Sequence, residues 1–327
     1  MLNKVGLFLL IALLCFVSTV QAKSKVLFIE SYHSGYLWDQ EVRSGLESVL
    51  QDKVELYNFQ MDTKRLGTTK YGERALKAWQ YYLKVKPDIV VLSDDNAMFL
   101  LSKWLLETNT PVVYVGINDN PRKYAPLGKN ITGVLERPLY KRTIKYLKEM
   151  LSFDNEKALI LMDNGTTSSV FRHSVFVDRD SIVIGGVQTD VKLFTDYDKW
   201  KNAVKNAAND GYKVIIIGLY HRLFDKGRNV DGEKVLCWTS ENSPVPVFAF
   251  WKMSVGEGRA VGGLVLSGEA QGRAAAEIVL KIIGGKPVNS IAPVIPEQGS
   301  FIFSQSELDR WKIRLPRDIR KRAHIVK

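Results

Sequence analysis

Polar and aromatic side chains stand directly after the short apolar runs that we expect to be buried strands. Parallel α/β sheets bind ligands at the carboxyl ends of their strands, so these are the residues that could bind or transform a small molecule. The candidate ligand-binding residues are Ser31, Tyr32, Trp38, Asp94, Asp95, Asn118, Asp119, Asn164, Thr166, Tyr220 and Trp251. Carboxylates and amides between aromatic rings suit a small polar molecule with a flat or cationic part.

The adjacent carboxylates Asp94 and Asp95 have three interpretations. They could contact a ligand, or cap a helix that we expect to begin near Asn96. They could also serve as the acid and base of a hydrolase. Adjacent residues in a loop rarely face one target, so the hydrolase is the alternative that the sequence favours least.

Other candidates also have structural interpretations. The sequence Asp-Thr-Lys-Arg at 62–65 is expected to form an internal ion-pair latch that holds its own loop. Asn118 and Asp119 fit a turn before a proline as well as a ligand contact. Thr166 and Thr167 stand at a predicted helix start, where free backbone N–H groups can bind a carboxylate or phosphate.

Common enzyme motifs are absent from the sequence. It contains no Gly-x-Ser-x-Gly elbow, no phosphate-loop lysine motif and no His-Glu-x-x-His zinc motif. Its four histidines are scattered without the spacing of metal ligands. We therefore predict a protein that is not an enzyme and that needs neither a cofactor nor a metal ion.

The elements that must position these residues alternate between strands and helices. Short apolar runs predict buried parallel strands, and apolar residues three or four apart predict the helices between them. In the first half the predicted strands are 25–29, 54–59, 88–92, 111–116 and 131–135. In the second half they are 157–162, 187–194, 213–218, 245–250 and 260–266, and Ser267 is expected to begin a helix that ends before Gly284.

Two runs of alternation predict an α/β protein with two doubly wound, Rossmann-like lobes joined by hinge strands. The expected N-terminal lobe comprises 23–135 plus 251–286, and the expected C-terminal lobe comprises 136–250 plus 287–327. No Gly/Ser-rich tether stands near 135–138, which suits a hinge of short strands.

Residues 1–22 have the pattern of a secretory signal peptide. Lys4 precedes an apolar run at 5–20, and Ala22 supplies the small residue at the expected cleavage position. An uncleaved anchor is the alternative, but the run is rather short to span a bilayer. The prediction is a periplasmic protein. Without Cys15, Cys237 has no partner for a disulfide, and its apolar neighbours predict a buried, inert thiol.

The mature chain is basic. The formal net charge is +11, and removal of Lys4 with the signal peptide leaves +10. Basic residues concentrate near the C-terminus, at Arg310, Lys312, Arg314, Arg317, Arg320, Lys321 and Arg322. Such a surface could make peripheral contact with an anionic membrane, or could simply be solvated charge. Nucleic acid is excluded as a natural partner of an exported chain.

Four motifs in order resemble one bacterial family. They are residues 31–38 (SYHSGYLW), 61–65 (MDTKR), 93–97 (SDDNA) and 116–119 (GIND), and the late segments 262–265 and 268–275 are similar as well. This pattern resembles the ABC-type substrate-binding proteins of the type I periplasmic-binding fold. It is most similar to the branch that serves as extracytoplasmic sensor domains of sensor kinases and diguanylate cyclases. The resemblance implies two lobes, three crossing strands and a ligand between the lobes.

The sequence thus predicts a periplasmic solute-binding protein that clamps a small polar ligand and presents it to an ABC-type permease. A ligand-sensing partner of a membrane-bound sensor kinase or diguanylate cyclase is the first alternative. A periplasmic hydrolase that uses Asp94 or Asp95 is the second.

Overall fold

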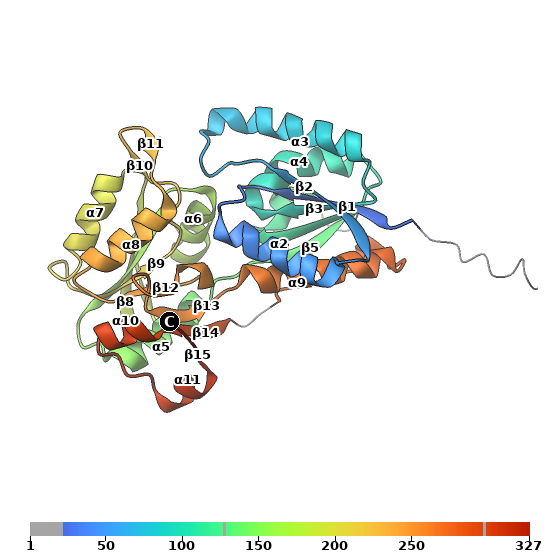
Figure 1. Ribbon diagram of the computed structural model, residues 1–327. Coiled ribbons are helices and arrows are strands. Elements are labelled where there is room, and N and C mark those ends of the chain that lie inside the picture. The colour runs from blue at the N-terminus through green and yellow to red at the C-terminus, as the bar shows by residue number, and fades with distance from the viewer. Residues whose placement is uncertain (1–21, 127–128, 297–298) are drawn as a thin grey trace, which may run out of the picture.

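Two α/β lobes lie side by side in the computed structural model, and each is built on its own five-stranded sheet (Figure 1). The structure describes residues 22–126, 129–296 and 299–327. The predicted signal peptide therefore lies, apart from Ala22, outside the described residues. Within the described ranges, none of the helices combines the length and the apolar character needed to cross a bilayer.

The first sheet is entirely parallel, in the order β2-β1-β3-β4-β5. Its strands are β1 (Ser24–Glu30), β2 (Val54–Gln60), β3 (Ile89–Ser93), β4 (Val112–Ile117) and β5 (Ile131–Leu135). Its helices are α2 (Leu37–Leu50), α3 (Tyr71–Val85), α4 (Asp94–Leu106) and the late helix α9 (Gly268–Ile283). Central strands such as β3 are buried along their whole length, which explains their continuous apolar sequence.

The second sheet has the order β12-β9-β6-β8-β7, and only the β7–β8 pair is antiparallel. Its strands are β6 (Lys157–Asp163), β7 (Ser181–Ile184), β8 (Val187–Phe194), β9 (Tyr212–Ile217) and β12 (Val247–Ala249). Its helices are α5 (Tyr140–Leu151), α6 (Thr166–Phe171), α7 (Tyr197–Lys205) and α8 (Gly232–Asn242). A small hairpin of β10 (Phe224–Asp225) and β11 (Arg228–Asn229) precedes α8.

The C-terminal residues add a three-stranded sheet next to the second lobe (Figure 1). Strand β13 (Gly262–Val265) pairs antiparallel with β14 (Ser300–Ser304), which pairs parallel with β15 (His324–Val326). Helices α10 (Gln305–Arg310) and α11 (Arg317–Arg322) lie between the last two strands and carry most of the basic tail.

The structure confirms the predicted α/β class and the two Rossmann-like lobes. It corrects the lobe boundary, because β13 contacts β12 and pairs with β14, whereas α9 packs on α2. The expected transfer of 251–286 to the N-terminal lobe was therefore wrong for 251–266. We propose an N-terminal lobe of 23–135 plus 267–286 and a C-terminal lobe of 136–266 plus 287–327.

Two local predictions also need correction. Helix α4 begins at Asp94 rather than near Asn96, and Ser93 is its N-cap residue, so Asp94 and Asp95 do not cap it. Cys237 is only half-buried on α8, where its thiol contacts Glu233 Oε1 at 3.3 Å. Consecutive residues of a helix point in different directions around its axis. The apolar neighbours of Cys237 in sequence can therefore be buried while its thiol is not.

Helices α2 and α9 join distant parts of the chain by an unusually close backbone contact. A side-chain carbon on Gly45 would overlap the carbonyl oxygen of Glu269, and one on Gly272 would overlap that of Val42. Glycine is therefore required on both helices, because only its missing side chain lets the two backbones approach so closely. This contact attaches α9, which follows the second lobe in sequence, to the first lobe.

We expect Gly272→Ala to destabilise the protein by about 1–3 kcal/mol, because the added methyl group must push α2 and α9 apart. Thermal or urea unfolding measures this loss. Gly72→Ala on α3 is the matched control, since nothing lies within 4 Å of an added carbon there. The control should be neutral or stabilising by up to about 1 kcal/mol. Equal stability of the two variants would contradict the packing argument.

Candidate functional site

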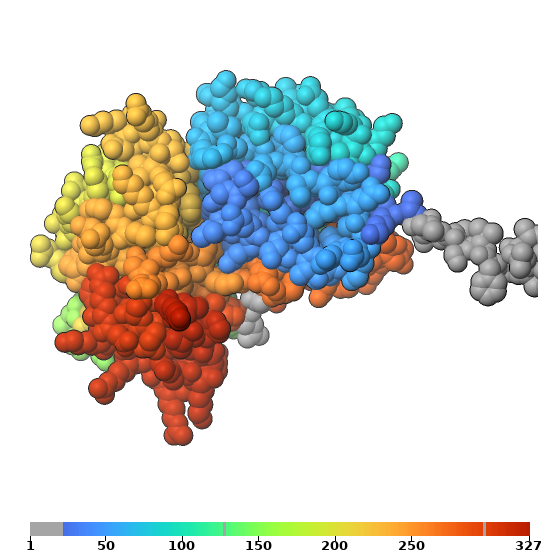
Figure 2. All heavy atoms as spheres, viewed as in Figure 1, coloured from blue at the N-terminus to red at the C-terminus, as the bar shows by residue number. Residues whose placement is uncertain are grey.

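The carboxyl ends of the two sheets face each other across a small buried cavity. Loops that follow strands of both lobes, together with a chain crossing between them, supply its walls. The lining residues are Tyr32, Tyr36, Trp38, Asp94, Asn118, Glu136, Thr167, Leu219 and Trp251. The cavity volume is about 10 Å³, which is room for about one water molecule. The lobes are in contact along their facing edges (Figure 2), so the structure shows a closed form.

Asp94 is the carboxylate at the centre of this cavity. It is 3 % exposed, and Oδ1 accepts a hydrogen bond of 3.0 Å from the hydroxyl of Tyr32. Its backbone has a φ of +70°, a left-handed conformation that aspartate tolerates better than most residues. Burial and then the negative charge of Asp95 raise the pKa of Asp94 to about 7, although Lys64 opposes this shift.

Glu136 faces Asp94 from the crossing that follows β5. It is 2 % exposed, and its two oxygens accept hydrogen bonds from Trp251 Nε1 at 2.6 Å and from Asn118 Nδ2 at 3.1 Å. Burial and then the charge of Asp94 raise the pKa of Glu136 to about 8. Two carboxyl groups with raised pKa values therefore share one desolvated space, where each disfavours the ionised form of the other.

The ammonium of Lys64 lies over two tyrosine rings next to the cavity, near enough to Asp94 to oppose the rise of its pKa. Lys64 is 3 % exposed, and its Nζ stands 4.4 Å from the ring centroid of Tyr32 and 5.1 Å from that of Tyr36. Both distances are within the range of cation–π interaction. The sequence had assigned Lys64 to an ion-pair latch, and the latch itself is present between Asp62 and Arg65 at 2.7 Å.

Asp95 points away from Asp94 and holds the next loop. One oxygen accepts from the backbone N–H of Asp119 and the hydroxyl of Tyr124, and the other accepts from the N–H of Asn118, all at 3.0–3.1 Å. These bonds fix the turn that presents Asn118 to the cavity. The adjacent carboxylates thus face different targets, unlike the acid and base pair of a hydrolase.

Several other candidate residues do not line the cavity. Ser31 bonds the carbonyl of Ser93 and the N–H of Ala97, and so connects β1 to α4. Tyr220 is buried against the hydroxyl of Ser254. Asn164 is exposed, and the carboxylate of Asp119 pairs with Lys123 at 2.9 Å. These side chains build the loops rather than the cavity wall.

Direct bonds between the lobes hold the closed form together. From the second lobe, Arg222 Nη1 donates to the carbonyl oxygen of Thr63 at 2.7 Å and to the hydroxyl of Tyr71 at 2.8 Å. The hydroxyl of Thr166 donates to Asn96 Oδ1 at 3.1 Å. Each bond joins the two halves of the molecule, and each must break when the lobes separate.

Aromatic rings also form a continuous bridge between the lobes. Tyr32 contacts Tyr36 edge-on, Tyr36 contacts His221 of the second lobe at 4.6 Å between centroids, and His221 stacks on Tyr220. Burial, followed by the nearby charge of Lys64, lowers the pKa of His221 well below its ordinary value. His221 is therefore neutral at physiological pH, so it adds no second positive charge next to the ammonium of Lys64.

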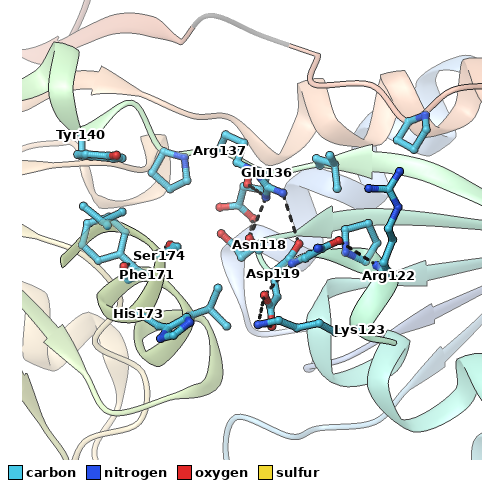
Figure 3. A pocket seen from close by; sticks show the side chains of 17 residues that line it. Asn118, Asp119, Arg122, Lys123, Glu136, Arg137, Tyr140, Phe171, His173 and Ser174 are labelled. Atoms are coloured by element: carbon cyan, nitrogen blue, oxygen red, sulfur yellow. Dashed lines mark hydrogen bonds and ion pairs between the residues drawn. The ribbon is translucent and has the colours of Figure 1, made fainter. Parts of the chain in front are cut away.

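A larger open groove of about 790 Å³ borders the cavity (Figure 3). It shares Asn118 and Glu136 with the cavity, and its far wall comes from residues 170–175 of the second lobe. Arg137 Nη1 donates to the carbonyl oxygens of Ile117 and Asn118 and so fixes the wall of the first lobe. The volume of this groove lies within the usual range of ligand pockets.

The cavity also contains residues that were not among the sequence candidates. Tyr36 lies within the loop run that was singled out, but it was not chosen from it. Glu136 directly follows the last predicted strand of the first half. It would have been found if the residues after that strand had been counted as candidates, as those after the other strands were. Thr167 stands at the predicted helix start that the sequence singled out together with Thr166, whereas nothing in the sequence distinguishes Leu219 from its neighbours.

The family model described as ABC transporter substrate binding protein matches residues 41–327 of this chain. No curated protein matches the chain at a significant level. Several solved structures are similar in fold.

A conserved domain protein from Vibrio cholerae superposes with a TM-score of 0.71 at 16% identity, covering 93% of this chain and 100% of that one. An ABC domain from Streptococcus pneumonia in complex with L-Trp gives 0.66 at 15% identity, covering 94% and 100%. A carbohydrate transporter solute-binding protein from Agrobacterium radiobacter in complex with D-arabinose gives 0.60 at 12% identity, covering 89% and 98%.

The raised pKa values of Asp94 and Glu136 predict a stability that falls as the pH rises. In the unfolded chain both groups titrate near about 4, so their contribution is fully present below about pH 4 and is lost as the pH approaches 7 to 8. We expect Asp94→Asn to weaken this decline and to gain stability relative to the wild type at pH 8. Urea unfolding between pH 5 and pH 8 tests this, with the exposed Glu241→Gln as control. Parallel pH profiles for Asp94→Asn and wild type would rule the argument out.

Loss of Arg222 should shift the ligand-free protein from the closed toward the open form, because each hydrogen bond between the lobes contributes about 0.5–1.5 kcal/mol to the closed form. We expect the ligand-free wild type to populate both forms, so small-angle scattering of Arg222→Ala should show a larger radius of gyration than that of the wild type. Arg228→Ala, an exposed arginine on the neighbouring hairpin, is the control and should leave the profile unchanged. An unchanged profile for Arg222→Ala would show that other contacts hold the lobes together.

Proposed function

Because this chain belongs to the family of ABC transporter substrate-binding proteins, we propose that it captures a small polar molecule between its lobes and presents it to an ABC-type permease. The observation that carries the proposal is the polar cavity at the facing carboxyl ends of the two sheets. Both lobes line this cavity, so a molecule held there contacts both at once. A ligand in this position favours closure through contacts that the open form cannot make.

The contacts between the lobes suit a closure that is easily reversed. They consist of a few hydrogen bonds from Arg222 and Thr166 and a line of aromatic rings, and no disulfide joins the lobes within the described residues. A hinge of short crossings can then separate the lobes at low cost. A ligand whose contacts with the closed form are worth about 5.5 kcal/mol more than those with the open form would convert a mostly open protein into a mostly closed one.

The proposed place of action is the periplasm. The pattern at residues 1–22 is that of a cleaved signal peptide, and a substrate-binding protein meets its permease on the outer side of the inner membrane. Helices α10 and α11, which carry most of the basic tail, lie next to the second lobe (Figure 1).

We expect ligand screening by thermal shift to identify a molecule that stabilises the mature protein and closes it in scattering experiments. Asp94→Ala should then weaken its binding by about 30-fold or more, roughly 2 kcal/mol, because a buried charged contact is lost. Isothermal titration calorimetry measures this change. Asp52→Ala, in an exposed turn after α2, is the control and should bind as the wild type does. The proposal would be wrong if the ligand-bound and ligand-free proteins had equal shapes, or if Asp94→Ala abolished a turnover of the bound molecule while leaving its affinity intact.

A further inference from the structure

The polar groups around the cavity carry more negative than positive charge. Asp94, Glu136 and Asp39 are all at most 3 % exposed, and Asp39 Oδ2 accepts from the backbone N–H of Tyr32 at 3.2 Å. Oδ1 of Asp39 is buried without a partner among the described residues. Against these carboxylates stands the ammonium of Lys64. A guest with negative charge would add to an existing repulsion, whereas a cation would relieve it.

The aromatic ring faces around the cavity also favour a cation over an anion. Tyr32 and Tyr36 present their faces to the ammonium of Lys64, and Tyr32, Tyr36, Trp38 and Trp251 all line the cavity. The negative face of an aromatic ring attracts a cation and repels an anion. The closed protein therefore already holds one primary ammonium in an aromatic and acidic environment, and that ammonium is its own.

An unsatisfied donor marks where a guest would complete the site. Trp38 Nε1 is buried and has no hydrogen-bond partner among the described residues. A carbon added to Gly116 would stand 3.6 Å from this nitrogen, 3.7 Å from Glu136 Oε2 and 3.8 Å from Asp94 Oδ2. One N–H donor and two carboxylate oxygens thus border the space above Gly116. A guest there meets two acceptors suited to an ammonium and one donor suited to a hydroxyl or a water molecule.

We propose that this site takes the ammonium group of a small organic cation, which binds between Asp94 and Glu136. The inference rests on the proposed function and adds the class of ligand to it. Since the closed cavity holds only about one water molecule, the lobes must separate before a guest can enter the site.

Four probes of equal chain length test the charge preference: 1,4-diaminobutane, 4-amino-1-butanol, 1,4-butanediol and succinate. We expect both amines to raise the melting temperature of the mature protein and to bind in calorimetry, and the diol and succinate to bind at least tenfold more weakly. The amines should also bind more tightly at pH 8 than at pH 6, because the cation must displace protons from Asp94 and Glu136. The titratable groups that face these carboxyls are Tyr32, Tyr36, Asp39, Lys64, Asp95 and His221.

Removal of the nearby positive charge is the second test. Lys64→Met should bind the better amine more tightly than the wild type, because the positive charge of Lys64 opposes a second cation near Asp94. Lys84→Met, an exposed lysine on α3, is the matched control and should leave the affinity unchanged. Lys64→Gln provides a second variant, and circular dichroism shows whether each variant is folded.

Three results would overturn the inference: succinate or the diol binding as well as the amines, neither amine binding at millimolar concentration, or weaker amine binding by both Lys64 variants. The last result would mean that Lys64 contacts the guest itself and that an acidic group belongs to the ligand. If a neutral or anionic compound from the wider screen closes the lobes, the cation assignment fails and the proposed function stands. If no compound closes them, the proposed function fails.

Discussion

Two carboxylates buried at the junction of the lobes impose the constraint on which the rest of the structure depends. Asp94 and Glu136 share a nearly dry space, and burial raises the pKa of both. The charge of Asp95 adds to the rise for Asp94, and the charge of Asp94 adds to the rise for Glu136. Hydrogen bonds and one nearby positive charge stabilise the two carboxyl groups. Tyr32, Trp251 and Asn118 donate hydrogen bonds to the two carboxyl groups, and Lys64 supplies a positive charge held over two tyrosine rings. The closed form is thus a compromise that a suitable guest would improve.

The scaffold serves this junction by bringing loops from both lobes to one place. Asp95 does not bind in the cavity but fixes the turn that presents Asn118, and Arg137 secures the same turn through its carbonyl oxygens. The close approach of α2 and α9 anchors the returning chain to the first lobe. Rigid lobes with a few breakable bonds between them are what a protein that closes and opens around a ligand requires.

Much of the fold followed from the sequence because its signals are local. Continuous apolar runs predicted β1, β5, β6, β8 and β9 to within about a residue or two, and α9 was found from its apolar spacing and its terminal glycines. Helices α5 and α8 and the C-terminal strands were not predicted, since their apolar faces are narrow or their strands short. The boundary near 251–266 was wrong because sheet pairing between β13 and β14 joins residues far apart in sequence.

For the candidate site, the sequence by itself determined which loops meet, since parallel strands end at one edge of a sheet. It therefore placed Tyr32, Trp38, Asp94, Asn118 and Trp251 at the junction where the structure has them. Only the tertiary structure decided the direction of each side chain. Asp94 and Asp95 are identical neighbours, yet a left-handed backbone turns one into the cavity and three hydrogen bonds hold the other in a loop. Likewise, the ammonium of Lys64 lies over the rings of Tyr32 and Tyr36 in a loop that docks against Arg222, and such long-range contacts are not encoded in the spacing of nearby residues.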